Sequence, residues 1–169
     1  MRRISIILTS LLLAFSLSAC GYGAVPETAT MGPAGNGADA VIGDLKVQEV
    51  LVINDGTNAV LTAVIVNTSD EPDTLLGASS DYDLLNMVDT STGVAVKTQG
   101  FEIAPKSTLT LSFTAPFSAV FNVADIPAVG EDVKVNFAFA RNGFVKVRAL
   151  VFANTDYYES VNPSAFALN

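Results

Sequence analysis

The chain has 169 residues, half of them hydrophobic, so it can bury the core of one domain and is too apolar to be disordered along most of its length. Seventeen acidic residues outnumber nine basic ones, which gives a formal charge of −8. Such an acidic surface repels phosphate backbones and anionic lipid headgroups, so we expect no nucleic-acid partner.

The N-terminus has the composition of a lipoprotein signal peptide. Two arginines follow Met1, residues 4–15 are almost entirely apolar, and Leu17-Ser18-Ala19-Cys20 places small residues before the only cysteine. The apolar run is shorter than the roughly twenty residues of a transmembrane helix. We predict that residues 1–19 are a signal peptide and that Cys20 carries the acyl anchor, which would hold the protein on the outer face of the cytoplasmic membrane. The alternative is an ordinary secretory signal with a coincidental cysteine.

Three regions follow the signal peptide. Residues 20–43 are rich in Gly, Ala, Thr and Pro and have no hydrophobic period, which predicts a flexible tether after the lipidated cysteine. Residues 44–155 carry the strand patterns of one domain, and residues 156–169 form a tail without a clear pattern. Seven basic and seventeen acidic residues lie beyond Cys20, so the mature chain has a formal charge of −10.

Short β-type runs fill the domain. Asn54 to Asn58 is typical of a hairpin connection. Arg141-Asn142-Gly143 separates the two clearest predicted strands, and the strand before this turn alternates apolar and polar residues. No segment favours a helix of more than two turns. About eight short strands divided by turns predict an all-β domain, a Greek-key β-sandwich or barrel. The predicted strands are 45–53, 59–66, 82–88, 94–97, 101–103, 109–113, 120–123, 133–139 and 144–151.

The residue types that are missing limit the chemistry. The chain has no histidine, and Cys20 is assigned to lipid, so histidine-based catalysis and thiolate or imidazole metal sites are disfavoured. After Met1 the methionines are Met31, which lies in the tether, and Met87. We therefore predict that the protein is no enzyme, with no catalytic residues, no metal ligands and no cofactor.

Carboxylates are the one reactive group in good supply. Paired carboxylates hydrolyse glycosides or bind Ca²⁺, although no spacing here matches a calcium-binding loop. The alternative is that they cap turns and keep an apolar domain soluble. The groups are Asp70, Glu71 and Asp73 in one loop, Asp81 and Asp83 shortly after it, and Glu131-Asp132 before a predicted strand.

Four segments, at positions 64–80, 101–105, 130–135 and 143–151, carry a resemblance to a known family. They read VIVNTSDEPDTLLGASS, FEIAP, GEDVKV and GFVKVRALV, and their order and spacing resemble those of the periplasmic copper-chaperone family (PCuAC-like), most closely its actinobacterial lipoprotein branch. The resemblance spans about residues 43–151 and implies a cupredoxin-like Greek-key barrel.

The resemblance also implies a copper site that this sequence lacks. Family members bind copper(I) through two His and two Met, expected here near residues 86–90 and 117–121, where the chain offers only Met87. Family chaperones deliver copper to the binuclear copper domain of the terminal oxidase. The resemblance therefore implies a non-enzymatic binding or accessory module that docks on a membrane complex such as the respiratory cytochrome oxidase. The alternative is a copper-transfer protein that combines Met87 with ligands from a partner, and a carboxylate-based hydrolase ranks third.

We expect the partner contact in the loop from Asn67 to Ser80, because loops carry recognition while strands carry packing. The candidate contact residues are Asp70, Glu71 and Asp73, of which Glu71 is the best candidate for an exposed contact. The alternative is that these carboxylates only shape the turn.

Overall fold

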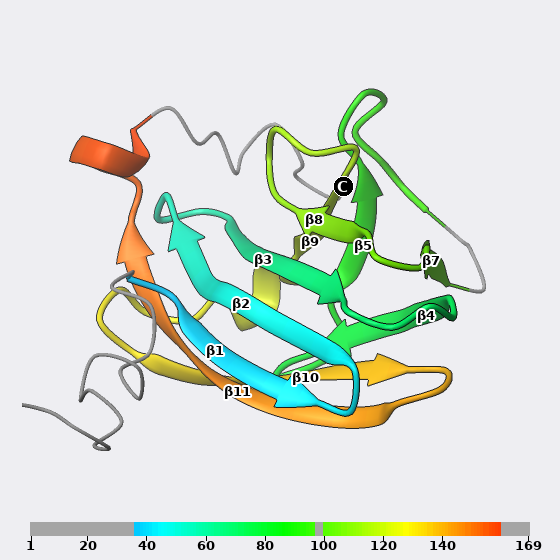
Figure 1. The fold of residues 1–169 in the computed structure, drawn as a ribbon. Coiled ribbons are helices and arrows are strands. Elements are labelled where there is room, and N and C mark those ends of the chain that lie inside the picture. The colour runs from blue at the N-terminus through cyan, green and yellow to red at the C-terminus, as the bar shows by residue number, and fades with distance from the viewer. Residues whose placement is uncertain (1–35, 97–99, 160–169) are drawn as a thin grey trace, which may run out of the picture. The chain divides into compact units, whose positions relative to one another are not determined.

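The computed structural model describes residues 36–96 and 100–159, which form an all-β domain (Figure 1). Two single-turn 3-10 helices, Val123–Asp125 and Asp156–Tyr158, complete the regular structure of these ranges. No helix in the described ranges is long and apolar enough to cross a membrane. The all-β class is confirmed, whereas Cys20 and the predicted signal peptide lie outside the described residues.

The described ranges contain eleven strands, more than the eight or so predicted. Ten follow one hydrogen-bonded path in the order β6-β5-β9-β8-β3-β2-β11-β10-β4-β7, and β1 pairs with β2 beside that path. The strands are β1 (Ala38–Ile42), β2 (Leu45–Asn54), β3 (Ala59–Asn67), β4 (Asp73–Ser79), β5 (Asn86–Asp89), β6 (Val94–Ala95), β7 (Phe101–Ile103), β8 (Thr108–Leu111), β9 (Phe117–Val120), β10 (Asp132–Phe139) and β11 (Gly143–Ala153).

The long strand β11 joins the two halves of the sheet. Along most of its length it pairs antiparallel with β10, and at its end it pairs parallel with β2, where Val151 lies opposite Val52. The sheet curls as it passes through β11, so its two ends approach each other (Figure 1). Phe101 of β7 packs against Phe117 of β9 with ring centroids 4.6 Å apart. We call this contact between the two ends of the path the seam.

One apolar core fills the inside of the curled sheet. The alternation predicted for β10 is confirmed, because Val133, Val135, Phe137 and Phe139 all point inward and are at most 3% exposed. Strands β2, β3, β4, β7, β8, β9 and β11 contribute to the same core. This core can stabilise the domain without a disulfide.

Strand β1 lies inside the segment that the sequence analysis assigned to the tether. It pairs antiparallel with β2 through the two-residue turn Gly43-Asp44, with Gly43 at φ +52°. A Gly-X pair is typical of such hairpin turns, and pairing with β2 stabilises a strand whose small residues alone have little β-propensity. Residues 38–43, which were assigned to the predicted tether, therefore belong to the domain, which begins earlier than residue 44.

Strand β4 corrects the prediction of a continuous loop from Asn67 to Ser80. Only the part up to Pro72 is a loop, and residues 73–79 form a central strand between β10 and β7. The strand was missed because Gly, Ser and Asp are uncommon in strands, whereas pairing on both edges and the full burial of Leu75 favour it here. Strands β5 and β9 also differ from prediction, since they cover Asn86–Asp89 and Phe117–Val120.

Candidate functional site

The strand pair β5–β9 lies where the family resemblance predicts the copper ligands. Met87 lies opposite Ala119 and Asp89 opposite Phe117 in an antiparallel register. The two chain segments singled out from the sequence are therefore direct neighbours in space.

The side chains that this pair directs into the core are almost all hydrocarbon. Met87 is 8% exposed and belongs to the core together with Ala119, and Phe117 packs against them. Phenyl and methyl groups have no lone pairs for a metal, which leaves the Met87 thioether as the single soft ligand of the pair. Because Met87 is buried, its sulfur is also poorly placed to share a metal with a partner.

Within residues 36–96 and 100–159, no three His, Cys, Asp or Glu side chains gather closely enough to hold a metal ion. The absence of a metal site nevertheless stays a prediction, because Met ligands and partner-supplied ligands are not covered by this observation.

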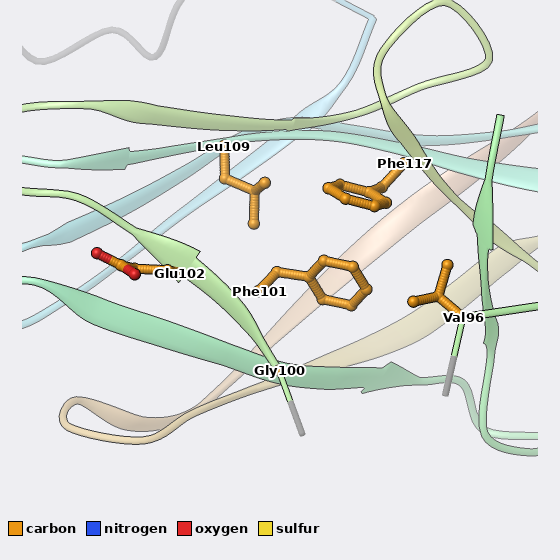
Figure 2. A pocket seen from close by; sticks show the side chains of 6 residues that line it. All are labelled: Val96, Gly100, Phe101, Glu102, Leu109 and Phe117. Atoms are coloured by element: carbon orange, nitrogen blue, oxygen red, sulfur yellow. The ribbon is translucent and has the colours of Figure 1, made fainter. Parts of the chain in front are cut away.

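A pocket of about 230 Å³ opens at the seam, beside the β5–β9 pair (Figure 2). In Figure 2 the rings of Phe101 and Phe117 lie next to each other in its lining, while the Glu102 carboxylate points away from them. A general acid–base pair needs two groups converging on one reacting atom, and this pocket has a single carboxylate on its rim. Its lining residues are Val96, Gly100, Phe101, Glu102, Leu109 and Phe117.

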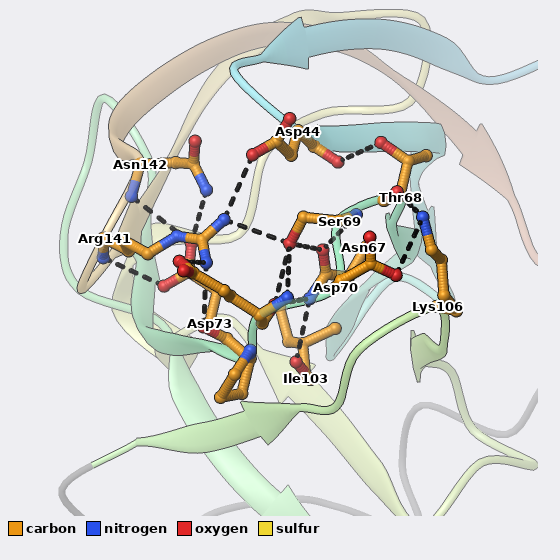
Figure 3. Close-up of polar contacts among 12 residues, drawn as sticks. Asp44, Asn67, Thr68, Ser69, Asp70, Asp73, Ile103, Lys106, Arg141 and Asn142 are labelled. Atoms are coloured by element: carbon orange, nitrogen blue, oxygen red, sulfur yellow. Dashed lines mark hydrogen bonds and ion pairs between the residues drawn. The ribbon is translucent and has the colours of Figure 1, made fainter.

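The acidic loop between β3 and β4 is built around the buried side chain of Asn67 (Figure 3). Its Nδ2 donates to the carbonyl oxygens of Glu71, Ile103 and Ala104, at 2.8, 3.2 and 3.2 Å. Its Oδ1 accepts hydrogen bonds from the backbone N–H and the hydroxyl of Ser69. The loop conformation is therefore held from inside by one amide side chain.

Asp73 is buried, which favours the alternative that this candidate contact residue shapes the turn. It is only 3% exposed, and Nδ2 of Asn142 donates to its Oδ2 at 2.8 Å, while the backbone N–H groups of Arg141 and Thr74 donate to Oδ1 at 2.9 and 2.7 Å. Burial by itself raises the pKa of this carboxyl, but the hydrogen bonds from Asn142, Arg141 and Thr74 outweigh it and lower the pKa below the ordinary 3.8. Asp73 thus ties the start of β4 to the β10–β11 turn.

Asp70 and Glu71 do lie at the surface, with side chains 89% and 77% exposed. Both have cationic partners, since Glu71 Oε2 lies 2.7 Å from Arg141 Nη1 and Asp70 Oδ1 lies 3.4 Å from Lys106 Nζ. Arg141 also contacts the Asp44 carboxylate at 3.1 Å. Of the three predicted residues, Asp70 and Glu71 are therefore accessible on the loop, whereas Asp73 is buried at the start of β4.

Sequence reasoning missed Arg141 as the hub of this network (Figure 3). The residue was assigned only to a hairpin turn, yet its guanidinium joins Asp44 of the β1–β2 turn to Glu71 and the Ser69 hydroxyl of the β3–β4 loop. One indication of this role is present in the sequence, because the chain has only nine basic residues and places one of them, Arg141, in a turn.

The remaining carboxylates that suggested hydrolysis are directed to separate partners. Asp81 forms an ion pair with Lys134 at 3.3 Å, and Asp83 accepts a hydrogen bond from Asn122 at 2.8 Å. Glu131 accepts a hydrogen bond from the Tyr82 hydroxyl, which raises the pKa of that tyrosine. Each of these carboxylates is therefore used in a local contact.

Three solved structures share this fold and define its class. "Copper-bound PCuAC domain from PmoF2" matches with a TM-score of 0.57 and 21% identity, covering 68% of this chain and 97% of that one. "Apo PCuAC domain from PmoF1" matches with 0.57 and 22%, covering 68% and 98%. "apo PmoF2 PCuAC domain" matches with 0.55 and 21%, covering 70% and 97%. The domain therefore has the cupredoxin-like all-β fold of PCuAC domains, as the sequence resemblance implied.

The family assignment is more specific. The family model described as "Putative lipoprotein LpqE-like" matches residues 41–151, which is most of the chain, and the chain belongs to this LpqE-like family. Comparison with curated proteins gave no match.

Proposed function

We propose that this chain is a lipid-anchored extracytoplasmic protein that works as a non-enzymatic accessory module and binds a membrane protein complex, with the respiratory cytochrome oxidase as the expected partner. Its bilayer contact is the acyl anchor on Cys20, and the tether lets the domain search the nearby surface. The family description as lipoproteins and the fold shared with PCuAC domains support this proposal.

The observation that carries the proposal is the composition of the β5–β9 pair. The chain has the fold of PCuAC domains, and in its β5–β9 pair Met87, Phe117 and Ala119 point into the core. A copper(I) centre needs several soft ligands, and one buried thioether is too few. A scaffold kept without its metal ligands is better suited to docking than to metal transfer.

A second candidate is copper transfer with ligands supplied by a partner. It is favoured because one of the similar structures is described as copper-bound, and because Met87 lies within the corresponding strand pair. The burial of Met87 counts against it, since a shared metal would have to reach a sulfur inside the core.

Affinity purification of the tagged, lipidated protein from detergent-solubilised membranes tests the proposal. We expect oxidase subunits to be enriched, as identified by mass spectrometry, and we expect Cys20→Ser to move the protein to the soluble exported fraction. No enrichment of any oxidase subunit over the Cys20→Ser sample would rule out this partner. If the serine variant stays on membranes after a high-salt wash, Cys20 is not the anchor.

Glu71→Lys tests whether the β3–β4 loop makes the contact. If the loop docks on a basic surface, the reversed charge slows association and reduces its salt dependence. Asp132→Lys is the matched control, because Asp132 is also an exposed carboxylate paired with an arginine, Arg148, at 3.2 Å. Equal recovery of all co-purifying proteins with both variants would exclude Glu71 from the contact.

A further inference from the structure

The outer face of the sheet carries an apolar cluster that is fully buried. Val60, Val88 and Val120 are at most 1% exposed, yet they form a cluster of their own, separate from the main core. Their chain neighbours Leu61 and Ala119 belong to the main core, so the three valines point to the opposite face. A second layer must therefore cover the sheet on this side.

The described apolar side chains supply only part of that layer. Leu51 and Ile53 form a neighbouring cluster on the same face, and Ile53 lies directly opposite Val60. Phe113 is the one described apolar side chain that packs on the valines, while Tyr158 packs on the neighbouring cluster. The face crosses β2, β3, β9 and β5, a width of about 14 Å at the usual strand spacing. One phenyl ring cannot seal the valine end of it.

A buried hydroxyl on this face also needs a partner. Ser118 is 0% exposed and lies opposite Val88, and its Oγ has no hydrogen-bond partner among the described residues. Buried polar groups are nearly always hydrogen-bonded, so the missing cover is expected to include a polar atom as well as apolar side chains.

The chain itself provides a suitable cover, which starts at the β2 edge of this face. The ring of Tyr158 lies 5.3 Å from that of Phe152, which places the end of the described chain on this face. Residues 160–169, which follow Glu159, carry no charged side chain and include Val161, Phe166 and Leu168. Ten extended residues reach about 33 Å, more than twice the width of the face.

We propose that residues 160–169 dock across the outer face of β2, β3, β9 and β5, where their apolar side chains cover the three valines and a main-chain carbonyl accepts the Ser118 hydroxyl. A different occupant is the segment before Asn36, whose Nδ2 donates to the Tyr158 hydroxyl at 3.0 Å. That segment is rich in Gly and Pro and contains Glu27, so it suits an apolar groove less well. A second copy of the chain is the other competitor.

A spin label distinguishes these occupants. In the mature chain with Cys20→Ser, a nitroxide attached at Leu168→Cys is expected to bleach the methyl NMR signals of Val88 and Val120. The matched label at Met31→Cys is expected to leave them intact. The proposal is wrong if the label at 168 leaves both valines unaffected or if the label at 31 bleaches them. It is also wrong if the effect passes only between molecules, which a mixture of spin-labelled and isotope-labelled chains detects.

A truncation gives a second, independent readout. Ending the chain after Glu159 is expected to expose the valines, to increase the fluorescence of an added anilinonaphthalene sulfonate dye and to lower the melting temperature. Unchanged dye fluorescence and melting temperature would contradict the proposal. Should the truncated chain fail to fold, the spin-label measurement on the full mature chain still decides.

Discussion

Carboxylates gather at the β3–β4 loop, whereas the β5–β9 pair directs hydrocarbon side chains into the core. Asp73, where the loop meets β4, is bonded to Asn142, and in the loop itself Glu71 and Asp70 pair with Arg141 and Lys106. In the strand pair, the positions where the family resemblance expects metal ligands hold residues that pack. The difference teaches that the charged side chains at this loop mainly build structure, while the departure from the expected copper ligands lies in apolar side chains that fill the core.

The largest expected effect comes from removing the carboxylate that anchors the loop. Asp73→Ala leaves Asn142 Nδ2 and the backbone N–H groups of Arg141 and Thr74 without their acceptor. Hydrogen bonds to a charged group contribute about 1.5–3 kcal/mol each, so we expect a loss of about 3 kcal/mol after partial relaxation. Urea unfolding measures it, and a loss below about 1 kcal/mol would show that Asp73 is not the tie described here.

The same carboxylate predicts an acid sensitivity. Because the folded-state pKa of Asp73 lies below the unfolded value near 3.8, its stabilisation is present above that value and is lost as the pH falls through the folded pKa. We expect the urea midpoint to decline at pH values below about 4, in part through this group. Asp73→Asn should flatten the decline, and an identical pH profile in both proteins would contradict the assignment.

The close approach of Gly100 to β4 gives the next largest effect. Gly100 has φ +143°, and a Cβ there would collide with the Thr74 side chain of β4. We expect Gly100→Ala to cost about 2 kcal/mol through strain and displacement of β7. Gly56→Ala is the control, because Gly56 also has a positive φ but faces open space. Equal losses in the two variants would show that the close packing of Gly100 against β4 contributes nothing.

The smallest effect is expected at the loop surface. Glu71→Gln breaks the ion pair with Arg141, whose side chain keeps contacts with Asp44 and Ser69. Exposed ion pairs contribute little, so thermal unfolding should change by no more than about 0.5 kcal/mol. A loss above about 1.5 kcal/mol would place Glu71 among the structural residues and remove it as a docking candidate.

The paired strands with strong alternation could be predicted from the sequence. Strands β2, β3, β10 and β11 have long apolar periods, and their hairpin turns contain Gly or Asn. Strands β1 and β4 could not, because their stability comes from pairing with neighbours distant in sequence, which overrides the weak β-propensity of Gly, Ala, Ser and Asp.

Part of the candidate site could likewise be predicted from the sequence, and part could not. The proximity of residues 86–90 and 117–121 followed from the family resemblance, and the structure confirms the strand pairing between them. The burial of Asp73 could not be predicted, since it depends on Asn142, which lies 69 residues away in sequence. The role of Arg141 was hidden for the same reason, because its partners lie in the β1–β2 turn and the β3–β4 loop, both distant from it in sequence.

The most direct test of the central claim is a copper(I) titration of the purified mature protein against a competing chelator. With Met87 as the single soft ligand of the β5–β9 pair, we predict no site tighter than nanomolar. Met87→Leu should give the same result as the wild type. A tight stoichiometric site in the wild type that Met87→Leu abolishes would contradict the account and restore copper transfer as the function.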